Sequence, residues 1–230
     1  MNRLLAAVFL TLLITPALAA NGSKLKATYS ITRAGQAIGE ISETLEIAKG
    51  EYRLESTTIP VGVLAIFVKD IIKQTSSGLH DSQGFHPQQF SYRRSTKPQK
   101  SLDASFDWEK HTATFNFDGK TESQALPEHL QDLLSLGYQL RFWPKAQDSL
   151  RLPVSNGKKI TEYALVRGGE ELLTVPAGRF NTTRYARERT PEHDGITVWV
   201  SDKLAAPIKV TIVEKKGAQT DQVLTRVTSE

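Results

Sequence analysis

Alternating apolar and polar positions dominate the chain after its first twenty residues. β-Branched and aromatic residues recur there at every second position, in runs separated by Gly-containing turns, at residues 25–57, 71–117 and 149–228. This period of two is typical of antiparallel strands with one buried face. Residues 101–108 and 112–117 predict one hairpin, and Gly168-Gly169 predicts a turn between two further strands.

A different pattern occupies residues 128–143. Its leucines and one Trp recur at intervals close to the helical repeat: Leu130, Leu133, Leu134, Leu136, Leu140 and Trp143. Pro127 suits the start of a helix and Pro144 suits its end, whereas Gly137 weakens the helical interior. The segment predicts one helix.

The most apolar stretch outside the N-terminus is IPVGVLAIFVKDII, residues 59–72. On a helix, Leu64, Phe67 and Ile71 share one face, and Pro60 suits the first turn. We therefore predict a short apolar helix that crosses one face of the sheet. It is either a core plug or a mobile cover over a hydrophobic pocket. A membrane-contacting segment is the third interpretation, although the stretch lacks the Lys/Arg-rich polar face of such helices.

These patterns predict a mainly β protein. We expect a single curved antiparallel sheet, a half-barrel or open barrel of roughly a dozen strands, with one or two helices on its concave face. No repeat, low-complexity segment or Pro/Gly/Ser-rich linker divides residues 20–230. We therefore expect one domain over that range.

Residues 1–19 have the features of a cleaved signal peptide. Arg3 precedes an apolar run at residues 4–14, Pro16 follows, and residues 17–19 supply the small-x-small pattern of a cleavage site. The apolar run is shorter than the roughly 20 residues that cross a bilayer. With no Cys in the chain, lipid attachment to a cysteine is excluded. The sequence predicts an exported, soluble protein with no transmembrane segment after cleavage.

Composition narrows the possible functions further. A net charge of +4 over 230 residues is too small to predict nucleic-acid binding. Without Cys there is no disulfide, thiol nucleophile or thiolate metal ligand. Two basic stretches are candidates for contact with lipid or glycan phosphates: Arg93 and Arg94 with Lys97 and Lys100, and Arg184 with Arg187 and Arg189.

Catalytic motifs are absent from the sequence. The chain has no G-x-S-x-G, G-x-G-x-x-G, P-loop or H-E-x-x-H pattern. Ser155 and Lys158 have S-x-x-K spacing, but the Asn-Gly between them predicts a hairpin turn. The groups at residues 80–86 and 192–194 contain His and acidic residues without compact metal-ligand spacing. We predict no enzymatic activity, no catalytic residues, no bound metal and no cofactor.

Several short segments carry a resemblance. They are QDLLS at 131–135, YQLR at 138–141, PAGRF at 176–180, VWVS at 198–201, API at 206–208, and the turn and strand at 29–39. In this order they resemble an uncharacterised periplasmic family of Gram-negative bacteria, the domain of unknown function numbered 3108. Within the helix, Asp132 and Ser135 have i, i+3 spacing and are expected to share a hydrogen-bond network or to cap neighbouring turns.

The resemblance implies a periplasmic location and a fold similar to the lipoprotein-carrier half-barrels, which hold acyl chains beneath helices. We therefore expect a non-enzymatic protein that binds or carries a lipid or acylated envelope component. The expected cavity residues are Val63, Leu64, Phe67, Leu133, Leu136, Leu140 and Phe142. Arg93 or Arg94 is expected to contact a headgroup. The alternatives are an interaction module for an envelope protein partner, working through a sheet edge, and an envelope hydrolase.

Overall fold

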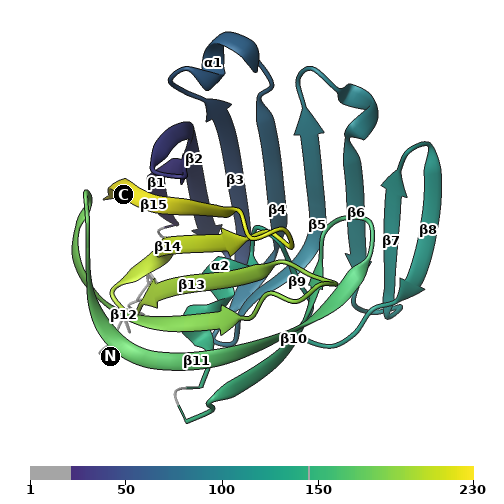
Figure 1. Cartoon of the computed structure of the whole chain (residues 1–230). Coiled ribbons are helices and arrows are strands. Elements are labelled where there is room, and N and C mark those ends of the chain that lie inside the picture. Colours follow the sequence, from purple (N-terminus) through teal and green to yellow (C-terminus); the bar gives the residue numbers. More distant parts are fainter. Residues whose placement is uncertain (1–21, 145) are drawn as a thin grey trace, which may run out of the picture.

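The computed structural model describes residues 22–144 and 146–230, so the predicted signal peptide lies outside the described residues. The first half of the described chain is a meander of eight strands (Figure 1). They are β1 (Ser23–Arg33), β2 (Gln36–Ala48), β3 (Glu51–Pro60), β4 (Ile72–Asp81), β5 (Gly84–Arg94), β6 (Leu102–Asp107), β7 (Thr112–Phe117) and β8 (Lys120–Ala125). β6 and β7 are the predicted hairpin, which is confirmed.

A second meander forms the rest of the same sheet. It contains β10 (Ser149–Ser155), β11 (Ile160–Val175), β12 (Gly178–Arg187), β13 (Gly195–Ser201), β14 (Leu204–Val213) and β15 (Gln219–Ser229). β15 pairs antiparallel with β1, so the first and last strands join the two meanders in the middle of the sheet. With the short β9 (Gln131–Asp132) at the edge beside β10, the sheet has 15 strands and stays open between β8 and β9.

The sheet curves strongly, so that β13, β14 and β15 cross in front of β3 and β4 (Figure 1). Shifts in strand register assist the bending, because a bulge increases local twist. One lies between Ser77 and Gly78 where β4 pairs with β5, and another between Arg167 and Glu170 in β11. The mainly β class and the single curved sheet are confirmed, with more strands than the predicted dozen.

A segment of the chain fills the space between the two meanders. We call residues 126–143 the plug; it contains β9, α2 (Leu136–Gln139) and the 3₁₀ turn η2 (Leu140–Phe142). The amide of Gln131 donates to the carbonyl of Phe85 at 2.8 Å, and the side chain of Gln139 accepts the N–H of Phe85 at 2.7 Å. Because β9 also pairs with β10, the plug links the edge of the second meander to β5.

The core surrounds the plug. Leu130 and Tyr138 of the plug are almost fully buried, together with Tyr29, Phe85 and Phe90 of the facing strands. The rings of Phe85 and Tyr138 meet edge to face, with centroids 6.2 Å apart, which is a favourable aromatic arrangement. The interior is therefore filled mainly by the plug rather than by a long helix.

The helix predicted over residues 128–143 is only partly present. The helical turns begin at Leu136, because the preceding residues pair as β9 with β10 and because His129 adopts a positive φ of 57°. Gly137 has a packing role instead of breaking the helix. A Cβ atom there would lie 3.0 Å from Pro207 Cγ, so any larger residue would require Pro207 or α2 to shift by a few tenths of an ångström.

The apolar segment 59–72 does not cross the concave face, so that prediction is wrong. β3 continues to Pro60, which pairs with Gly39, and β4 resumes at Ile72, which pairs with Thr58. Only α1 (Leu64–Phe67) is helical, at the outer end of the β3–β4 hairpin (Figure 1). Strand pairing on both sides satisfies the backbone of this segment and leaves only a short tip.

Two other strand predictions also need correction. The expected turn at Gly168-Gly169 is a bulge inside the continuous 16-residue β11. β8 was not predicted, because its residues KTESQA are polar or small and every one of them is exposed.

Candidate functional site

A groove lies on the concave side of the sheet, between the two meanders. Two adjoining pockets of about 250 and 380 Å³ form it, and they share Leu133, Ile196 and Ile212. Together they fall within the roughly 300–1,000 Å³ typical of small-molecule sites. We call the two pockets the concave groove. β2, β3 and β4 supply one wall, β13 and β14 supply the other, and the plug supplies the floor.

The inner pocket of the concave groove is mainly apolar. Leu133 and Ile212, which line both pockets, are 42% and 40% exposed. These partly exposed side chains lie within a continuous apolar lining, and contiguous exposed apolar surface of this kind is a feature of ligand-binding grooves. The other apolar residues of this pocket are Ile41, Leu134, Leu136, Ile196, Val198, Pro207 and Val210.

One carboxyl group lies on the wall of this apolar pocket. Glu43 of β2 is buried, and Tyr138 Oη of α2 donates to its Oε2 at 2.6 Å. Burial raises the pKa of Glu43 to about 7, and hydrogen bonds from Tyr138 and Ser56 oppose that shift only partly. The carboxyl is therefore neutral over much of the range below pH 7, which makes this wall less polar than the sequence suggests.

The outer pocket is polar and carries several cationic groups. Lys159, Arg187 and Lys215 line it, together with the acidic Glu192 and Asp194. The guanidinium carbon of Arg187 lies 4.1 Å from the centroid of the Tyr163 ring, so a cation–π contact holds this buried arginine in place. With three cationic and two acidic side chains, the outer end of the concave groove has a small excess of positive charge, whereas the inner end is mainly apolar.

A buried polar network anchors the plug beside the groove. Asp132 accepts from Ser76 Oγ at 2.5 Å and from the backbone N–H groups of Leu134 at 2.9 Å and Ser135 at 2.8 Å. The N–H of Asp132 in turn donates to Ser135 Oγ at 3.0 Å. Burial raises the pKa of Asp132 to about 6, although these hydrogen bonds oppose the shift. The predicted network between Asp132 and Ser135 is confirmed.

This network is closed to solvent. Ser76, Asp132 and Ser135 have no exposed surface, and Ser76 Oγ lies 2.7 Å from Tyr52 Oη. A substrate has no access to these hydroxyl groups in this arrangement. The network therefore fixes the position of the plug and does not form a surface site.

Some of the predicted cavity residues lie in or near the concave groove. Leu133 and Leu136 line it, although Leu136 is buried in its floor. Leu140 is fully buried in the second core cluster and lines none of the pockets described here. Phe142 is half-buried, and its ring packs against His80 and Phe85 with centroids 5.7 and 5.8 Å away. Two of these four residues therefore line the concave groove, and their role in ligand binding stays a prediction.

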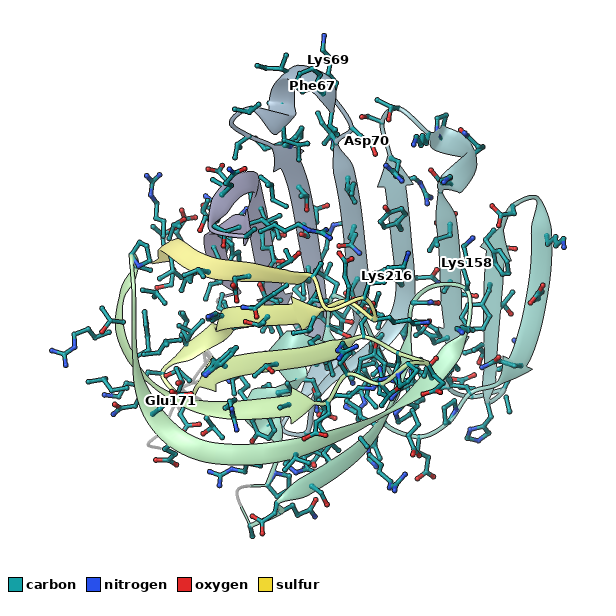
Figure 2. The ribbon with its side chains drawn as sticks, viewed as in Figure 1. Phe67, Lys69, Asp70, Lys158, Glu171 and Lys216 are labelled. Carbon is teal, nitrogen blue, oxygen red and sulfur yellow. The ribbon has the colours of Figure 1, made fainter. Side chains whose placement is uncertain are left out.

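The other predicted cavity residues are elsewhere. Val63, Leu64 and Phe67 lie at the tip of the β3–β4 hairpin, and Phe67 is 79% exposed (Figure 2). Their assignment to a shared cavity with the plug leucines is wrong. Hydrophobicity predicted burial correctly for the plug, but strand pairing carries β3 and β4 beyond the concave face.

The predicted headgroup contacts are also outside the groove. Arg93 donates to Asp103 at 2.6 Å and to the carbonyl of Leu102 at 2.7 Å. Arg94 donates to Asp70 at 2.5 Å. Neither arginine lines the concave groove, so neither would contact the headgroup of a ligand bound there. Arg187, from the second basic stretch, is the arginine that the fold places there.

Several groove residues were not singled out from the sequence, including Glu43, Lys159, Ile196, Ile212 and Lys215. A signal for Glu43 was present. In β2, the inward-facing positions are Gly39, Ile41, Glu43, Leu45 and Ile47, so Glu43 is the one charged residue in an apolar series. The others come together only through the curvature of the sheet.

A larger depression of about 760 Å³ lies over β4, β5 and the β6–β7 turn. Some of its polar groups are engaged with one another or with the backbone. His86 Nε2 lies 3.1 Å from Asp81 Oδ1, and the indole N–H of Trp108 donates to the carbonyl of Pro87 at 2.8 Å. The charged residues of the depression are acidic, and no Lys or Arg lines it, unlike the outer pocket of the concave groove. We therefore favour the concave groove as the functional site.

Two further findings concern the described part of the chain. Within residues 22–144 and 146–230, three or more His, Asp or Glu side chains nowhere gather in a way that could hold a metal ion. Over the same residues, no helix is both long enough and apolar enough to cross a membrane.

The fold has similar relatives among solved structures. A β-barrel-like protein of the domain of unknown function DUF1849 from Brucella abortus matches with a TM-score of 0.61 and 10% identity, over 90% of this chain and 98% of that one. A predicted lipoprotein from Parabacteroides distasonis matches with a TM-score of 0.38 and 10% identity, over 90% and 95% of the two chains. The first similarity shows a shared β-barrel-like fold.

Among curated proteins, none matches the sequence. A family model does match, over residues 26–223, from the middle of β1 to the middle of β15. That match covers both meanders, the plug and the concave groove. The chain therefore belongs to the family described as protein of unknown function, DUF3108.

Proposed function

We propose that the protein binds an anionic amphipathic molecule with an acyl chain, a lipid or an acylated envelope component, in the concave groove. The observation that carries the proposal is the continuity of the groove. Leu133, Ile196 and Ile212 connect an apolar pocket to a pocket lined by Arg187 and Lys215. An acyl chain fits the first pocket, and a carboxylate or phosphate fits the second.

The proposal includes binding or carriage without covalent chemistry, in an exported periplasmic protein. The polar groups of the apolar pocket support this, because Glu43 and Tyr138 are already hydrogen-bonded to each other. A ligand that displaced this bond would leave buried polar groups unpaired. The pocket therefore favours ligands that make apolar contacts and leave that bond in place.

A charge placed in the apolar part of the groove is expected to abolish binding. Leu133→Asp should weaken binding of a fluorescent long-chain fatty acid by about tenfold or more, because the probe loses apolar contact and meets a carboxylate. Leu133 is 42% exposed, so the variant should remain folded. Fluorescence titration measures the affinity, and circular dichroism verifies the fold.

Leu172→Asp is the matched control, because Leu172 of β11 is 53% exposed and lies outside both pockets of the groove. For the headgroup end, Lys215→Gln is paired with Lys216→Gln, since only Lys215 lines the outer pocket. Native mass spectrometry of protein isolated from the periplasm without detergent should also show a lipid-sized adduct. Equal affinities for Leu133→Asp and Leu172→Asp would contradict the proposal.

A second candidate function is a protein-interaction module that works through a sheet edge. The specific observation is β8, which pairs with β7 on one side only and has all six residues exposed. An extended peptide can add to such an edge by main-chain hydrogen bonds. A protein that binds no lipid probe, yet takes up a partner strand beside β8, would favour this function.

A further inference from the structure

The outer end of the β3–β4 hairpin exposes a cluster of large apolar side chains. We call residues 61–68 the apolar tip. Val63, Ile66 and Phe67 are 74%, 69% and 79% exposed. Phe67 and Lys69 both project from the outer end of this hairpin (Figure 2). Single exposed apolar residues are ordinary on protein surfaces, but a contiguous group on a protrusion marks an interaction site.

The backbone of the apolar tip is hydrogen-bonded internally. The N–H of Ala65 donates to the carbonyl of Gly62 at 3.2 Å, and the N–H of Val68 donates to the carbonyl of Leu64 at 2.8 Å. Val61 is tied to the neighbouring strand, since its N–H donates to the carbonyl of Ile38 at 3.2 Å. A segment that enters lipid needs its backbone N–H and C=O groups to be hydrogen-bonded within the protein, because the hydrocarbon offers no hydrogen-bond partners.

A rigid base connects the apolar tip to the next loop. Asp70 is buried and accepts from the N–H of Thr96 at 3.0 Å, from Thr96 Oγ1 at 2.7 Å and from Arg94 Nε at 2.5 Å. The N–H of Ser95 donates to the carbonyl of Ile71 at 2.9 Å. The beginning of the β5–β6 loop is therefore held against the base of the tip.

This connection places positive charge at the same end of the sheet as the tip (Figure 1). Lys69 follows the tip directly. The β5–β6 loop carries Lys97, which precedes the 3₁₀ turn η1 (Pro98–Lys100), and Lys100, which ends it. All three lysines are exposed, and we call them the cationic collar. The nearby carboxylate of Asp70 is already bound to Arg94. Glu40, opposite Ile59 on β2, is an exposed acidic residue near the base.

We propose that the apolar tip inserts into the surface of an anionic lipid bilayer, with the cationic collar against the lipid phosphates. Exposed apolar side chains with lysines beside them suit a bilayer surface, because the long lysine side chains can reach the charged headgroups while the apolar side chains enter the hydrocarbon. The sequence of residues 59–72 lacks this polar face when considered alone. The fold supplies it from the β5–β6 loop. The proposal is independent of the concave groove, because no tip or collar residue lines it.

The absence of Cys from the chain permits a direct test. Ile66→Cys, labelled with an environment-sensitive fluorophore, should show a blue shift and increased emission with vesicles of equal parts phosphatidylcholine and phosphatidylglycerol. The same label at Leu172→Cys should not respond, because Leu172 lies on β11, in the second meander. No response at position 66 would overturn the proposal, and is the result expected if the tip instead binds a protein.

Vesicle sedimentation with unlabelled protein tests the two parts of the proposal separately. Phe67→Asp should reduce the partition constant roughly tenfold or more, while Leu172→Asp should leave it unchanged. Lys97→Gln and Lys100→Gln should each reduce it about fivefold. Lys216→Gln, in the β14–β15 turn away from the tip (Figure 2), should have no comparable effect.

Equal partition of Phe67→Asp and Leu172→Asp would overturn insertion of the tip. Equal binding of the unaltered protein to pure phosphatidylcholine vesicles would overturn the role of the collar. These results can be separated from a failure of the proposed groove function. Leu133→Asp should lose the fatty-acid probe and keep vesicle binding, and Phe67→Asp should do the reverse.

Discussion

Replacing Asp132 with Ala is expected to lower the free energy of unfolding by about 3 kcal/mol, because it leaves buried donors without an acceptor. The carboxylate binds Ser76 Oγ and the backbone N–H groups of Leu134 and Ser135. Ser76 can still bond Tyr52, but the two backbone groups have no alternative partner in the network. Loss of these bonds also frees the plug from β4.

Urea denaturation at pH 7 measures this effect, and two variants calibrate it. Asp132→Asn keeps an amide oxygen that can accept both backbone N–H groups, so it should lose less stability than Asp132→Ala. Asp103→Ala removes an exposed partner of Arg93, and exposed ion pairs contribute at most about 1 kcal/mol. A loss for Asp132→Ala no larger than that for Asp103→Ala would show that the network does not anchor the plug.

Asp132 also shows how far the sequence can predict the fold. Its i, i+3 spacing to Ser135 predicted a local network, and the structure contains it. The partner from β4, Ser76, lies 56 positions away and could not be predicted. Alternation identifies the buried face of each strand but does not determine which strands oppose each other across a curved sheet.

The apolar tip and β8 show two ways in which hydrophobicity fails as a guide. The tip is the most apolar stretch of the described chain, yet Phe67 is exposed. The reason is strand pairing, because β3 pairs with β2 as far as Pro60 and with β4 as far as Thr58. β8 has no large apolar side chain, yet it forms a strand through its ladder with β7. In both cases the backbone pairing of strands determines the structure, and the pattern of apolar and polar side chains does not reveal that pairing.

The concave groove was predictable only in part. Leu133 and Leu136 were identified because they belong to the periodic leucines of the plug. Ile196 and Ile212 are ordinary strand residues in sequence, and they reach the groove because β13 and β14 cross in front of β3 and β4 (Figure 1). The curvature of the sheet brings the two walls of this groove together. The wall formed by β13 and β14 therefore cannot be predicted from the sequence of any single segment.

The protein is expected to lose stability as pH rises through 7, because Glu43 must then ionise inside the core. Burial raises the pKa of Glu43 to about 7 from its usual 4.5. The folded state therefore holds the proton more tightly than the unfolded state does. The resulting stabilisation is complete below about pH 4.5 and is lost as the pH rises through 7. That pKa difference corresponds to about 3 kcal/mol.

Glu43→Gln should remove this dependence, because its side-chain amide stays neutral at every pH and keeps an oxygen to accept from Tyr138. Asp132, with a pKa of about 6, adds a dependence of the same sign that both proteins share, and exposed carboxylates contribute to both alike. The informative quantity is therefore the difference in unfolding free energy between the original protein and Glu43→Gln, followed by denaturation from pH 4 to pH 8. It should change by about 3 kcal/mol across that range in favour of the variant. Glu40→Gln, an exposed position on the same strand, should show no such change. Unfolding free energies of both variants that changed with pH as in the original protein would contradict this prediction. Glu43 would then be ionised over the whole pH range. The apolar pocket would contain a buried charge, fully compensated by its hydrogen bonds.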